Sequence, residues 1–484
     1  MENAEFSMGE SSYANYTKER ISHWDNIAGN LTRWNKCNSY YHQRLQDIIG
    51  LAVPPGQKII EIGCGTGDML AALRPSYGVG IDFSTEMIRR AKISHPDIHF
   101  IVADAHTLDI KDTFDYVIIS DVVNEFWDVQ TVFQKILSLT TSRTRIIINF
   151  YNRLWEAPLS IVRKSGLAKP MLLQNWLTVE DITGLLALAG FEVISHKAEI
   201  IWPVRFPVLD AVFNLFLVKL WPFNIFAITH CMIAKPVNNQ EDSKSMPNVS
   251  VIIPARNESG NIDRIFKTVP AMGSETELIF VEGGSTDDTY EVIEKAMSDH
   301  PHRASKLLKQ TGKGKGDAVR LGFQNAKGDI LMILDADLTV PPEDLPRFYD
   351  AIHSGKAEFV NGVRLVYPME KEAMRFLNLV GNKFFSLIFS WLLGQPIKDT
   401  LCGTKVLWKR DYERIAANRS YFGDFDPFGD FDLLFGAAKL NLKIVEVPVR
   451  YRERIYGTTN ISRWKHGWLL LKMVFFALRK IKFR

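Results

Sequence analysis

One rhythm recurs through most of this chain: a short apolar run, a turn that contains glycine or aspartate, and then a helical pattern. It appears first as "QKIIEIGCGTGDMLAAL", "YGVGIDFSTEMIRRAK" and "FDYVIISDVVNE", and later as "NVSVIIPARNESGNIDRIFKTV", "TELIFVEGGSTDDTYEVIEKAM" and "GDILMILDADLTVPPEDLPRF". Strands that alternate with helices are typical of parallel sheets with helices on their faces. The sequence therefore predicts an α/β fold twice.

A polar segment separates the two α/β regions. The stretch "KPVNNQEDSKSMPN", residues 235–248, is rich in proline, asparagine, serine and charge, which is typical of a linker. With 484 residues, the chain is also about two to three times as long as a usual domain. We expect a first domain over residues 1–235, a linker over 236–247, a second domain over 248–465 and a tail over 466–484.

Charge and cysteine content exclude several classes of protein. Lys and Arg number 58 and Asp and Glu number 55, so nothing indicates a nucleic-acid partner. The 4 cysteines form no C-x-x-C pair, which disfavours a zinc site or a disulfide framework and favours a reducing cytoplasm. The N-terminus lacks the basic and then apolar pattern of a signal peptide.

Three apolar stretches raise the question of a membrane. Residues 206–234 and 376–394 are interrupted by charged residues, proline or asparagine, so we expect neither to cross a bilayer. A place on a membrane surface and a buried place both remain open for them. The tail "HGWLLLKMVFFALRKIKFR" is apolar and basic, and it predicts an amphipathic helix. This helix either lies in the headgroup layer or packs on the second domain.

In the first half, a glycine-rich turn follows a strand that ends at Glu61. Its glycines are Gly63, Gly65 and Gly67, and a helix follows them. Glycines in such a turn let the backbone approach a nucleotide-like ligand at a helix N-terminus. A dinucleotide fingerprint would need glycine where this chain has Asp68, so hydride chemistry is not indicated.

Acidic residues end the next two strands. Asp82 is placed to accept the hydroxyls of a ribose, and Asp104 would end the third strand. With "FDYVIISDVVNE", this set resembles the class I S-adenosylmethionine-dependent methyltransferases over roughly residues 40–200. The resemblance implies a Rossmann-like fold and methyl transfer to a small molecule or glycan precursor. It assigns the methionine end of the cofactor to Glu61 and the glycine turn, the ribose to Asp82, and the adenine to Asp104 and Ala105.

The methyl acceptor is not readable from the sequence, because methyl transfer depends mainly on alignment. By position, Tyr40, Tyr41 and His42 before the first strand and residues 149–152 after the fifth are candidate lid and pocket residues. Such aromatic residues are more often part of the core. A non-catalytic binding module that retains the fold is the alternative for this half.

In the second half, polar residues follow three predicted strands. Pro254 ends the first, Glu282 ends the second, and the third delivers Asp335 and Asp337. Alternation along an extended chain places the two aspartates on the same side. Oxygen ligands at the carboxyl end of a strand suit a hard divalent cation that also holds phosphates.

Five motifs in order make residues 248–460 resemble the inverting glycosyltransferases of family 2: "IIPARNE", "VEGGSTDDT", "GKGDAVRLGF", "DADL" and "FGDFDLLFGAAK". The resemblance implies a GT-A fold, a nucleoside-diphosphate sugar as donor, and Mg²⁺ or Mn²⁺ on Asp335 and Asp337. The family usually has two aspartates where this chain has Glu282-Gly283, so the nucleotide base stays open. The donor-binding residues that the resemblance implies are Pro254, Arg256, Asn257, Glu258, Glu282, Lys313, Asp335 and Arg452.

The implied reaction is in-line attack on the sugar C1 while the nucleoside diphosphate leaves. Lys315 and Arg452 would stabilise the charge on the leaving phosphate. For a hydroxyl acceptor, Asp430 or Asp432 matches the position of the base in this family. An N-cap of the following helix is an equal interpretation of Asp430.

Within the family, "VNGVRL", "DTLCGTK" and "YRERIYGTTNISRWKHG" look like the dolichol-phosphate mannose synthase branch. In that branch, Arg364 and Arg375 would grip the phosphate of a polyprenyl phosphate, although Leu379 stands where a serine is expected. We therefore expect a bifunctional transferase, peripheral at the inner face of the cell membrane. The alternative is a family 2 enzyme that uses a saccharide or glycolipid hydroxyl as acceptor.

Overall fold

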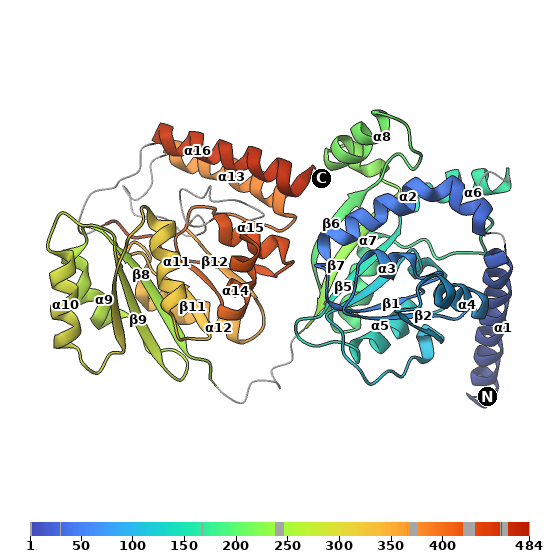
Figure 1. Cartoon of the computed structure of the whole chain (residues 1–484), viewed down its shortest axis with the longest axis horizontal. Helices are drawn as coiled ribbons and strands as arrows, with labels where there is room; N and C mark the ends of the chain where they lie inside the picture. Colours follow the sequence, from blue (N-terminus) through green and yellow to red (C-terminus); the bar gives the residue numbers. More distant parts are fainter. Residues whose placement is uncertain are drawn as a thin grey trace. The chain divides into compact units, whose positions relative to one another are not determined.

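The computed structural model describes residues 2–29, 31–165, 169–237, 246–364, 366, 376–419, 431–454, 456 and 463–483. The chain divides into two compact units, Met1–Val237 and Asn238–Arg484. Figure 1 shows a sheet with helices on its faces in each unit, so the α/β prediction is confirmed for both halves. The exact bounds of the linker and the tail stay predictions.

The first unit is built on a seven-stranded sheet in the order β3-β2-β1-β4-β5-β7-β6. Its strands are β1 Lys58–Ile62, β2 Tyr77–Asp82, β3 His99–Val102, β4 Tyr116–Ser120, β5 Arg145–Tyr151, β6 Phe191–Glu199 and β7 Thr229–Pro236. Strands β1 to β5 pair in parallel, whereas β7 is antiparallel to β5 and β6. The strand order reverses at β1 and β4, and ligands of such sheets bind beyond the carboxyl ends of the strands at this point.

Helices cover both faces of this sheet. They are α1 Glu2–Gly29, α2 Leu31–Ala52, α3 Asp68–Ala72, α4 Thr85–Ser94, α5 Val129–Leu137, α6 Glu156–Lys164 and α7 Val179–Leu188. Successive residues of a strand pack into two different hydrophobic cores, one on each face of the sheet. Ile60 packs in the cluster of Phe133, and Ile59 packs in the cluster of Leu45. Because both faces are buried, the strands read as continuous apolar runs.

A long connection, residues 200–228, joins β6 to β7; we call it the β6–β7 insertion. It contains the short helix α8 Leu209–Ala211 and further helical turns over Val212–Phe216, Leu217–Lys219 and Phe223–Phe226. The apolar stretch 206–234 is therefore divided between this insertion and most of β7.

The second unit has a seven-stranded sheet in the order β10-β9-β8-β11-β13-β12-β14. Its strands are β8 Val249–Ala255, β9 Thr276–Glu282, β10 Ser305–Lys309, β11 Ile330–Ile333, β12 Phe359–Val363, β13 Lys405–Trp408 and β14 Ile444–Pro448. Strands β10, β9, β8 and β11 are parallel, and β13 is antiparallel to both of its neighbours. The carboxyl ends of β8, β9 and β11 therefore meet at one edge of the sheet.

The helices of this unit include a long apolar pair. In chain order they are α9 Ile262–Thr268, α10 Thr289–Asp299, α11 Lys315–Asn325, α12 Leu345–His353, α13 Phe376–Leu393, α14 Lys409–Ala417, α15 Phe431–Lys439 and α16 Arg463–Ala477. Helices α13 and α16 lie side by side (Figure 1). Phe389 of α13 and Met473 of α16 are buried in one core cluster. The helix of the tail thus packs on the second unit.

Within the described ranges, no helix combines the length and the apolar character that are needed to cross a membrane. The stretch 376–394 corresponds to α13, and residues 466–477 form most of α16. A final turn of π-helix, Leu478–Lys482, continues from α16.

Candidate active sites

The glycine turn of the first unit follows β1 and approaches the end of β4. Gly63 has a positive φ of 72°, and a Cβ at this position would lie 2.6 Å from a side-chain carbon of Val122. Gly67 has φ 77°, and its Cβ would strike the ring of Phe100 at 2.5 Å. Only glycine avoids both the left-handed strain and these clashes. The turn is therefore held close against its neighbours, as a nucleotide-binding turn requires.

Two carboxylates stand beside this turn. Glu61 is buried, its Oε2 accepts the backbone N–H of Leu70 at 3.1 Å, and burial raises its pKa well above the usual range. Asp82 accepts the N–H of Gly65 on Oδ2 and that of Ser84 on Oδ1, each at 2.9 Å. Burial raises the pKa of Asp82 as well. Asp82 therefore ties the end of β2 to the glycine turn.

The predicted adenine residues lie at the end of β3. Oδ2 of Asp104 accepts a hydrogen bond from the hydroxyl of Tyr13. Its Oδ1 is hydrogen-bonded to Nδ1 of His106 at 2.8 Å. Burial alone would raise the pKa of Asp104, but these hydrogen bonds hold it below its usual value. Ala105 begins the short turn Ala105–Thr107. The glycine turn and the acidic ends of β2 and β3 fit the nucleoside and methionine ends of S-adenosylmethionine.

Helix α1 contacts the same edge of the sheet, which sequence reasoning missed. Besides the Tyr13 hydrogen bond, Asp25 accepts the hydroxyl of Ser84 at 2.5 Å. Arg20 and Glu125 form a buried ion pair with 3.3 Å between Nε and Oε2. The N-terminal helix is thus tied to residues that follow β2, β3 and β4. The signal for it in the sequence is weak, because α1 has no pronounced apolar face.

A second missed residue, Asp121, follows β4 directly. It has a positive φ of 54°, an uncommon conformation for a residue other than glycine. Its Oδ1 accepts the hydroxyl of Tyr41 at 2.9 Å and Nδ2 of Asn149 at 2.6 Å. Burial raises its pKa. An aspartate at the carboxyl end of a buried parallel strand was the available signal.

The predicted pocket residues have different roles. Tyr41 and Asn149 meet at Asp121, and the ring of Tyr151 stacks on Tyr41 with 6.4 Å between centroids. Burial lowers the pKa of His42. Tyr40, in contrast, accepts a hydrogen bond from the β6–β7 insertion. Asn152 likewise bonds the insertion, and Phe150 is core.

In the second unit, the loops after β8 and β9 hold each other. The N–H of Asn257 donates to Oγ of Ser285 at 3.0 Å, and the N–H of Thr286 donates to Oδ1 of Asn257 at 2.8 Å. Asn257 adopts φ 56°. Glu282 at the end of β9 accepts the N–H of Ser285 at 2.5 Å. The polar groups after Pro254 and those after Glu282 therefore form one rim.

Asp335 and Asp337 follow β11, and each holds a cation of the chain. Oδ1 of Asp335 lies 2.6 Å from Nζ of Lys315, and Oδ2 of Asp337 lies 2.6 Å from Nη2 of Arg454. Burial would raise the pKa of Asp335, but Lys315 holds it below its usual value. Carboxylate oxygens that already bind cations fit Mg²⁺ or Mn²⁺. The described residues contain no group of three or more His, Cys, Asp or Glu that could hold a metal ion.

Arg454 was not predicted, and it joins two parts of this site. Its Nη1 lies 3.3 Å from Oε1 of Glu258, while its Nη2 binds Asp337. Burial raises the pKa of Glu258 to about 7 despite the nearby guanidinium. Arg452, which was predicted, lies 4.0 Å from Glu343 instead. Lys313 is exposed in the loop before α11.

Of the predicted base and acceptor residues, Asp432 and Arg364 are each paired with another charged side chain. Asp432, in the first turn of α15, has its Oδ2 3.3 Å from Nε of Arg419. Asp430 and Arg375 lie outside the described residues. Arg364 forms a bidentate pair with Asp399, with Nε–Oδ2 at 2.7 Å and Nη2–Oδ1 at 2.8 Å.

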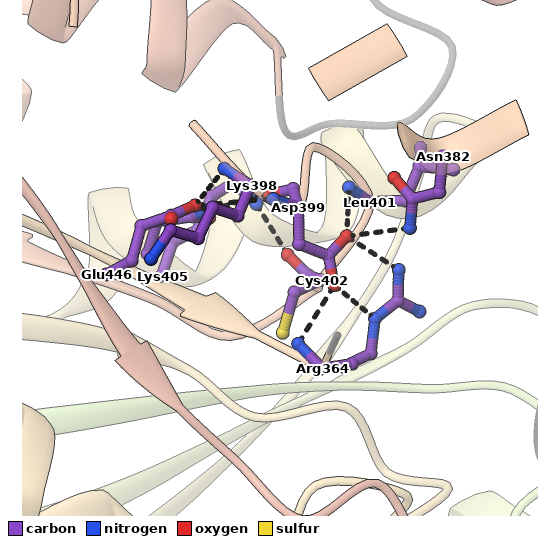
Figure 2. A network of polar contacts seen from close by, with 9 residues as sticks. Arg364, Asn382, Lys398, Asp399, Leu401, Cys402, Lys405 and Glu446 are labelled. Carbon is purple, nitrogen blue, oxygen red and sulfur yellow. Dashed lines mark hydrogen bonds and ion pairs between the residues drawn. The ribbon is translucent and has the colours of Figure 1, made fainter. Parts of the chain in front are cut away.

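Figure 2 shows that Asp399 is the centre of a buried polar network. Besides Arg364, it accepts Nδ2 of Asn382 at 3.2 Å and the N–H of Leu401 at 3.0 Å. Burial would raise its pKa, but the pair with Arg364 lowers it to about 2. This network fixes the loop that carries Gly403, where a Cβ would lie 2.0 Å from Oδ2 of Asp335. The "DTLCGTK" motif therefore shapes the wall of the aspartate site.

Two family models match the chain. A glycosyl transferase family 2 model matches residues 250–415, and a methyltransferase domain model matches residues 54–190. The chain thus carries a methyltransferase domain followed by a family 2 glycosyltransferase domain, as the sequence predicted.

Curated relatives match less than half of the chain. A dolichol-phosphate mannosyltransferase of Pyrococcus furiosus is 30% identical over 235 residues, 46% of this chain and 64% of its own length. An undecaprenyl-phosphate 4-deoxy-4-formamido-L-arabinose transferase of Pectobacterium carotovorum is 37% identical over 219 residues, 44% of this chain and 63% of its own length. The chain therefore spans less than two thirds of each of these relatives.

Solved structures were also found that each cover less than half of the chain. A methyltransferase of Thermotoga maritima is 14% identical with a TM-score of 0.36, over 44% of this chain and 98% of its own. Glucosyl-3-phosphoglycerate synthase of Mycobacterium tuberculosis, in complex with Mn²⁺ and uridine diphosphate, is 18% identical with a TM-score of 0.36, over 49% of this chain and 81% of its own.

Proposed function

We propose that this protein is a bifunctional transferase. Its second unit moves a sugar from a nucleoside-diphosphate sugar to a polyprenyl phosphate, and its first unit transfers a methyl group from S-adenosylmethionine to a small molecule or glycan precursor. The observation that carries the proposal is the pair Asp335 and Asp337 after β11, which form ion pairs with the side chains of Lys315 and Arg454. This pair lies within the match to family 2 glycosyl transferases.

The chain's own cations suit the departure of a diphosphate. Asp335 and Asp337 would hold Mg²⁺ or Mn²⁺, which offsets the charge on a diphosphate when it is bound. Lys315 is the first residue of α11, so its positive charge adds to that of the helix N-terminus beside the aspartates. Arg454 lies between Asp337 and Glu258, within reach of the same leaving group. Groups that are fixed before the reaction stabilise developing charge most effectively.

A phosphate acceptor agrees with the residues around the site. The matched relatives are by name transferases of dolichol phosphate and undecaprenyl phosphate. A phosphate oxygen is already anionic, so it needs no base, and Asp432 is engaged by Arg419. Arg364 and Arg375 are the proposed ligands of this phosphate, with Asp399 as the group that aligns Arg364.

The helix pair α13 and α16 supports a site at a membrane surface. Leu387 and Phe475 are 72% and 71% exposed, and Trp468 is exposed with Lys472 beside its ring. Apolar side chains flanked by lysine favour the boundary between headgroups and acyl chains. We propose that the protein binds peripherally, at the inner face of the cell membrane.

Mass spectrometry of lipid extracts tests the glycosyl transfer. Cells that express the protein should accumulate a polyprenyl phosphate sugar, and Asp335→Ala should remove it. Purified protein should release a nucleoside diphosphate from a sugar donor only with a lipid phosphate and Mg²⁺ or Mn²⁺, and the variant should be at least about 100-fold slower. Absence of this release with every donor and lipid phosphate would refute the proposal.

The substitution Asp430→Asn distinguishes the alternative acceptor, a saccharide or glycolipid hydroxyl, from a phosphate acceptor. A hydroxyl must lose its proton during attack, so removal of the base would cost about 100-fold or more in rate. A phosphate acceptor predicts a modest effect of the same substitution.

A further inference from the structure

The β6–β7 insertion, residues 200–228, is far longer than its position in the sheet requires. It joins two neighbouring antiparallel strands, which loops of about two to five residues usually connect. Figure 1 shows it, in green around α8, as a separate group of turns beyond the ends of β6 and β7. The insertion is not needed to complete the sheet.

Many large apolar side chains of the insertion are exposed, although Val218 and Ile228 pack inward. Trp221, Val208 and Phe226 are 81%, 73% and 59% exposed, whereas Asn214 is 1% exposed. Lys219 is also buried, in an ion pair with Glu199. A segment that covers a core places its apolar side chains inward and its polar ones in water. A large exposed apolar surface marks a site of contact with something other than water.

Buried hydrogen bonds hold the insertion in this shape. Oδ1 of Asn214 accepts the N–H groups of Ile201 and Trp202 at 2.8 and 2.9 Å. Its Nδ2 donates to the carbonyl of Trp202 at 2.7 Å and to the hydroxyl of Tyr40 at 3.1 Å. Because the amide uses both its oxygen and its nitrogen, the buried polar group is well satisfied.

A second set of bonds fixes the end of the insertion. Nδ2 of Asn152 donates to the carbonyls of Ile225 and Ala227 at 3.0 and 2.8 Å. Nε1 of Trp155 donates to the carbonyl of Phe226 at 3.1 Å. The backbone is thus satisfied from the inside, while the apolar side chains are presented outward on a fixed frame.

We propose that the β6–β7 insertion is a membrane-binding surface of the methyltransferase unit, which enters the boundary between headgroups and acyl chains of an anionic bilayer. Tryptophan is enriched at this boundary, and Trp221 and Trp202 are exposed here. Arg205 of the insertion is also exposed, and the one acidic residue of the insertion, Asp210, is partly buried. An exposed arginine among apolar side chains suits the phosphate of a lipid headgroup. The surface goes beyond the proposed reactions, because neither transfer requires it.

A lipid occupant explains the surface better than a second copy of the chain does. A protein interface pairs polar groups around an apolar centre, at about one hydrogen bond per 100–200 Å². The inner face of the insertion uses Asn214 and Lys219, so the outer face keeps mainly hydrocarbon and Arg205. Segments that bind at a bilayer surface typically combine such apolar side chains with a flanking cation.

Vesicle flotation of the full chain tests the proposal. All proteins carry Leu387→Ser and Phe475→Ser, which remove one strongly exposed apolar residue from each of α13 and α16. Vesicles of phosphatidylglycerol and phosphatidylethanolamine should still bind this parent. Adding Phe206→Ser, Trp221→Ser and Phe226→Ser should weaken partitioning more than about tenfold. Ile93→Ser with Leu188→Ser, equally exposed positions of the first unit outside the insertion, should leave partitioning unchanged.

Fluorescence quenching by brominated acyl chains gives a second readout, which does not require a variant that could destabilise the fold. Trp221→Phe keeps an apolar ring and should remove part of the tryptophan quenching seen with the parent. Equal partitioning of the triple variant and the parent, with unchanged quenching in Trp221→Phe, would overturn the proposal. A concentration-dependent dimer that Trp221→Ser converts to monomer, with vesicle binding unaffected, would also overturn it in favour of a second copy.

Discussion

At the scale of single residues, both sites depend on carboxylates whose partners come from distant parts of the chain. Asp121 meets Tyr41 and Asn149, and Asp337 meets Arg454. Asp121 directly follows β4 and Asp337 lies in the turn after β11, so the sheet sets the position of each aspartate. Its partner is brought there by packing. The sequence at one strand end therefore predicts the acidic group of a site, but it does not predict which side chain pairs with that group.

The pair of Arg364 and Asp399 should be essential for the stability of the second unit. Asp399 is fully buried, so Asp399→Asn leaves the guanidinium without its counter-charge and should cost about 3–5 kcal/mol of unfolding free energy. Denaturant unfolding followed by tryptophan fluorescence measures this. Arg364→Met combined with Asp399→Leu removes both charges and should cost clearly less. A double variant as unstable as Asp399→Asn would contradict this account.

Glu258 should make stability depend on pH near neutrality. Burial raises its pKa to about 7, while Arg454 lowers it and Asp337 and Asp335 raise it. Since the folded value exceeds the unfolded one, the stabilising contribution is complete below about pH 4 and is lost as pH rises through about 7. Without divalent cations, the melting temperature of the wild type relative to Glu258→Gln should therefore fall from about pH 5 to about pH 8. A constant difference would show that Glu258 does not titrate in this range.

At the scale of elements, helices α13 and α16 each have two kinds of apolar residue. Leu470 and Met473 lie in the core, whereas Leu387 and Phe475 are exposed. The periodicity of the tail predicted an amphipathic helix and left a membrane position and a packed position open. In the structure, one face of α16 packs on the second unit while another remains exposed, so the packed position is confirmed and the membrane position stays a proposal. Deletion of the tail would remove both faces of α16 at once, so it would not distinguish core packing from vesicle binding.

Surface substitutions separate these roles. Leu387→Ser with Phe475→Ser should reduce vesicle binding of the full chain and leave its melting temperature within about 1 °C, because surface changes are usually worth less than 0.5 kcal/mol. Leu470→Ser should instead destabilise the second unit by about 2–5 kcal/mol, as loss of a buried leucine does. Thermal unfolding and flotation measure both. Unchanged vesicle binding in the surface variant would remove the support that the helix pair gives to a membrane site.

At the scale of the whole molecule, each unit has its own sheet and its own cores. No strand or core cluster is shared between Met1–Val237 and Asn238–Arg484 among the described residues. Two cofactor chemistries can therefore be joined in one chain without a change to either fold.

Calorimetric unfolding should accordingly show two transitions that respond to different ligands. S-adenosylmethionine at about 100 times its Kd should stabilise the first unit by about 2.7 kcal/mol and leave the other transition in place. Asp82→Ala should abolish this shift, because Asp82 ties the glycine turn to the end of β2. A nucleoside diphosphate with Mn²⁺ should shift only the second transition. If S-adenosylmethionine shifts neither, the first unit is a binding module without the cofactor.

The sequence by itself determined the two α/β folds, the glycine turn and the acidic strand ends, because these features follow from local periodicity and from short spacings such as Gly63 to Gly67. The tertiary structure alone decided that Asp121 joins Tyr41 and Asn149, that Arg454 rather than Arg452 binds Asp337, and that Arg364 is held by Asp399. It also decided that many apolar side chains of the β6–β7 insertion face outward while Asn214 is buried. The physical reason is that a pattern along the chain shows which residues are apolar or charged, whereas packing between distant segments decides which of them meet.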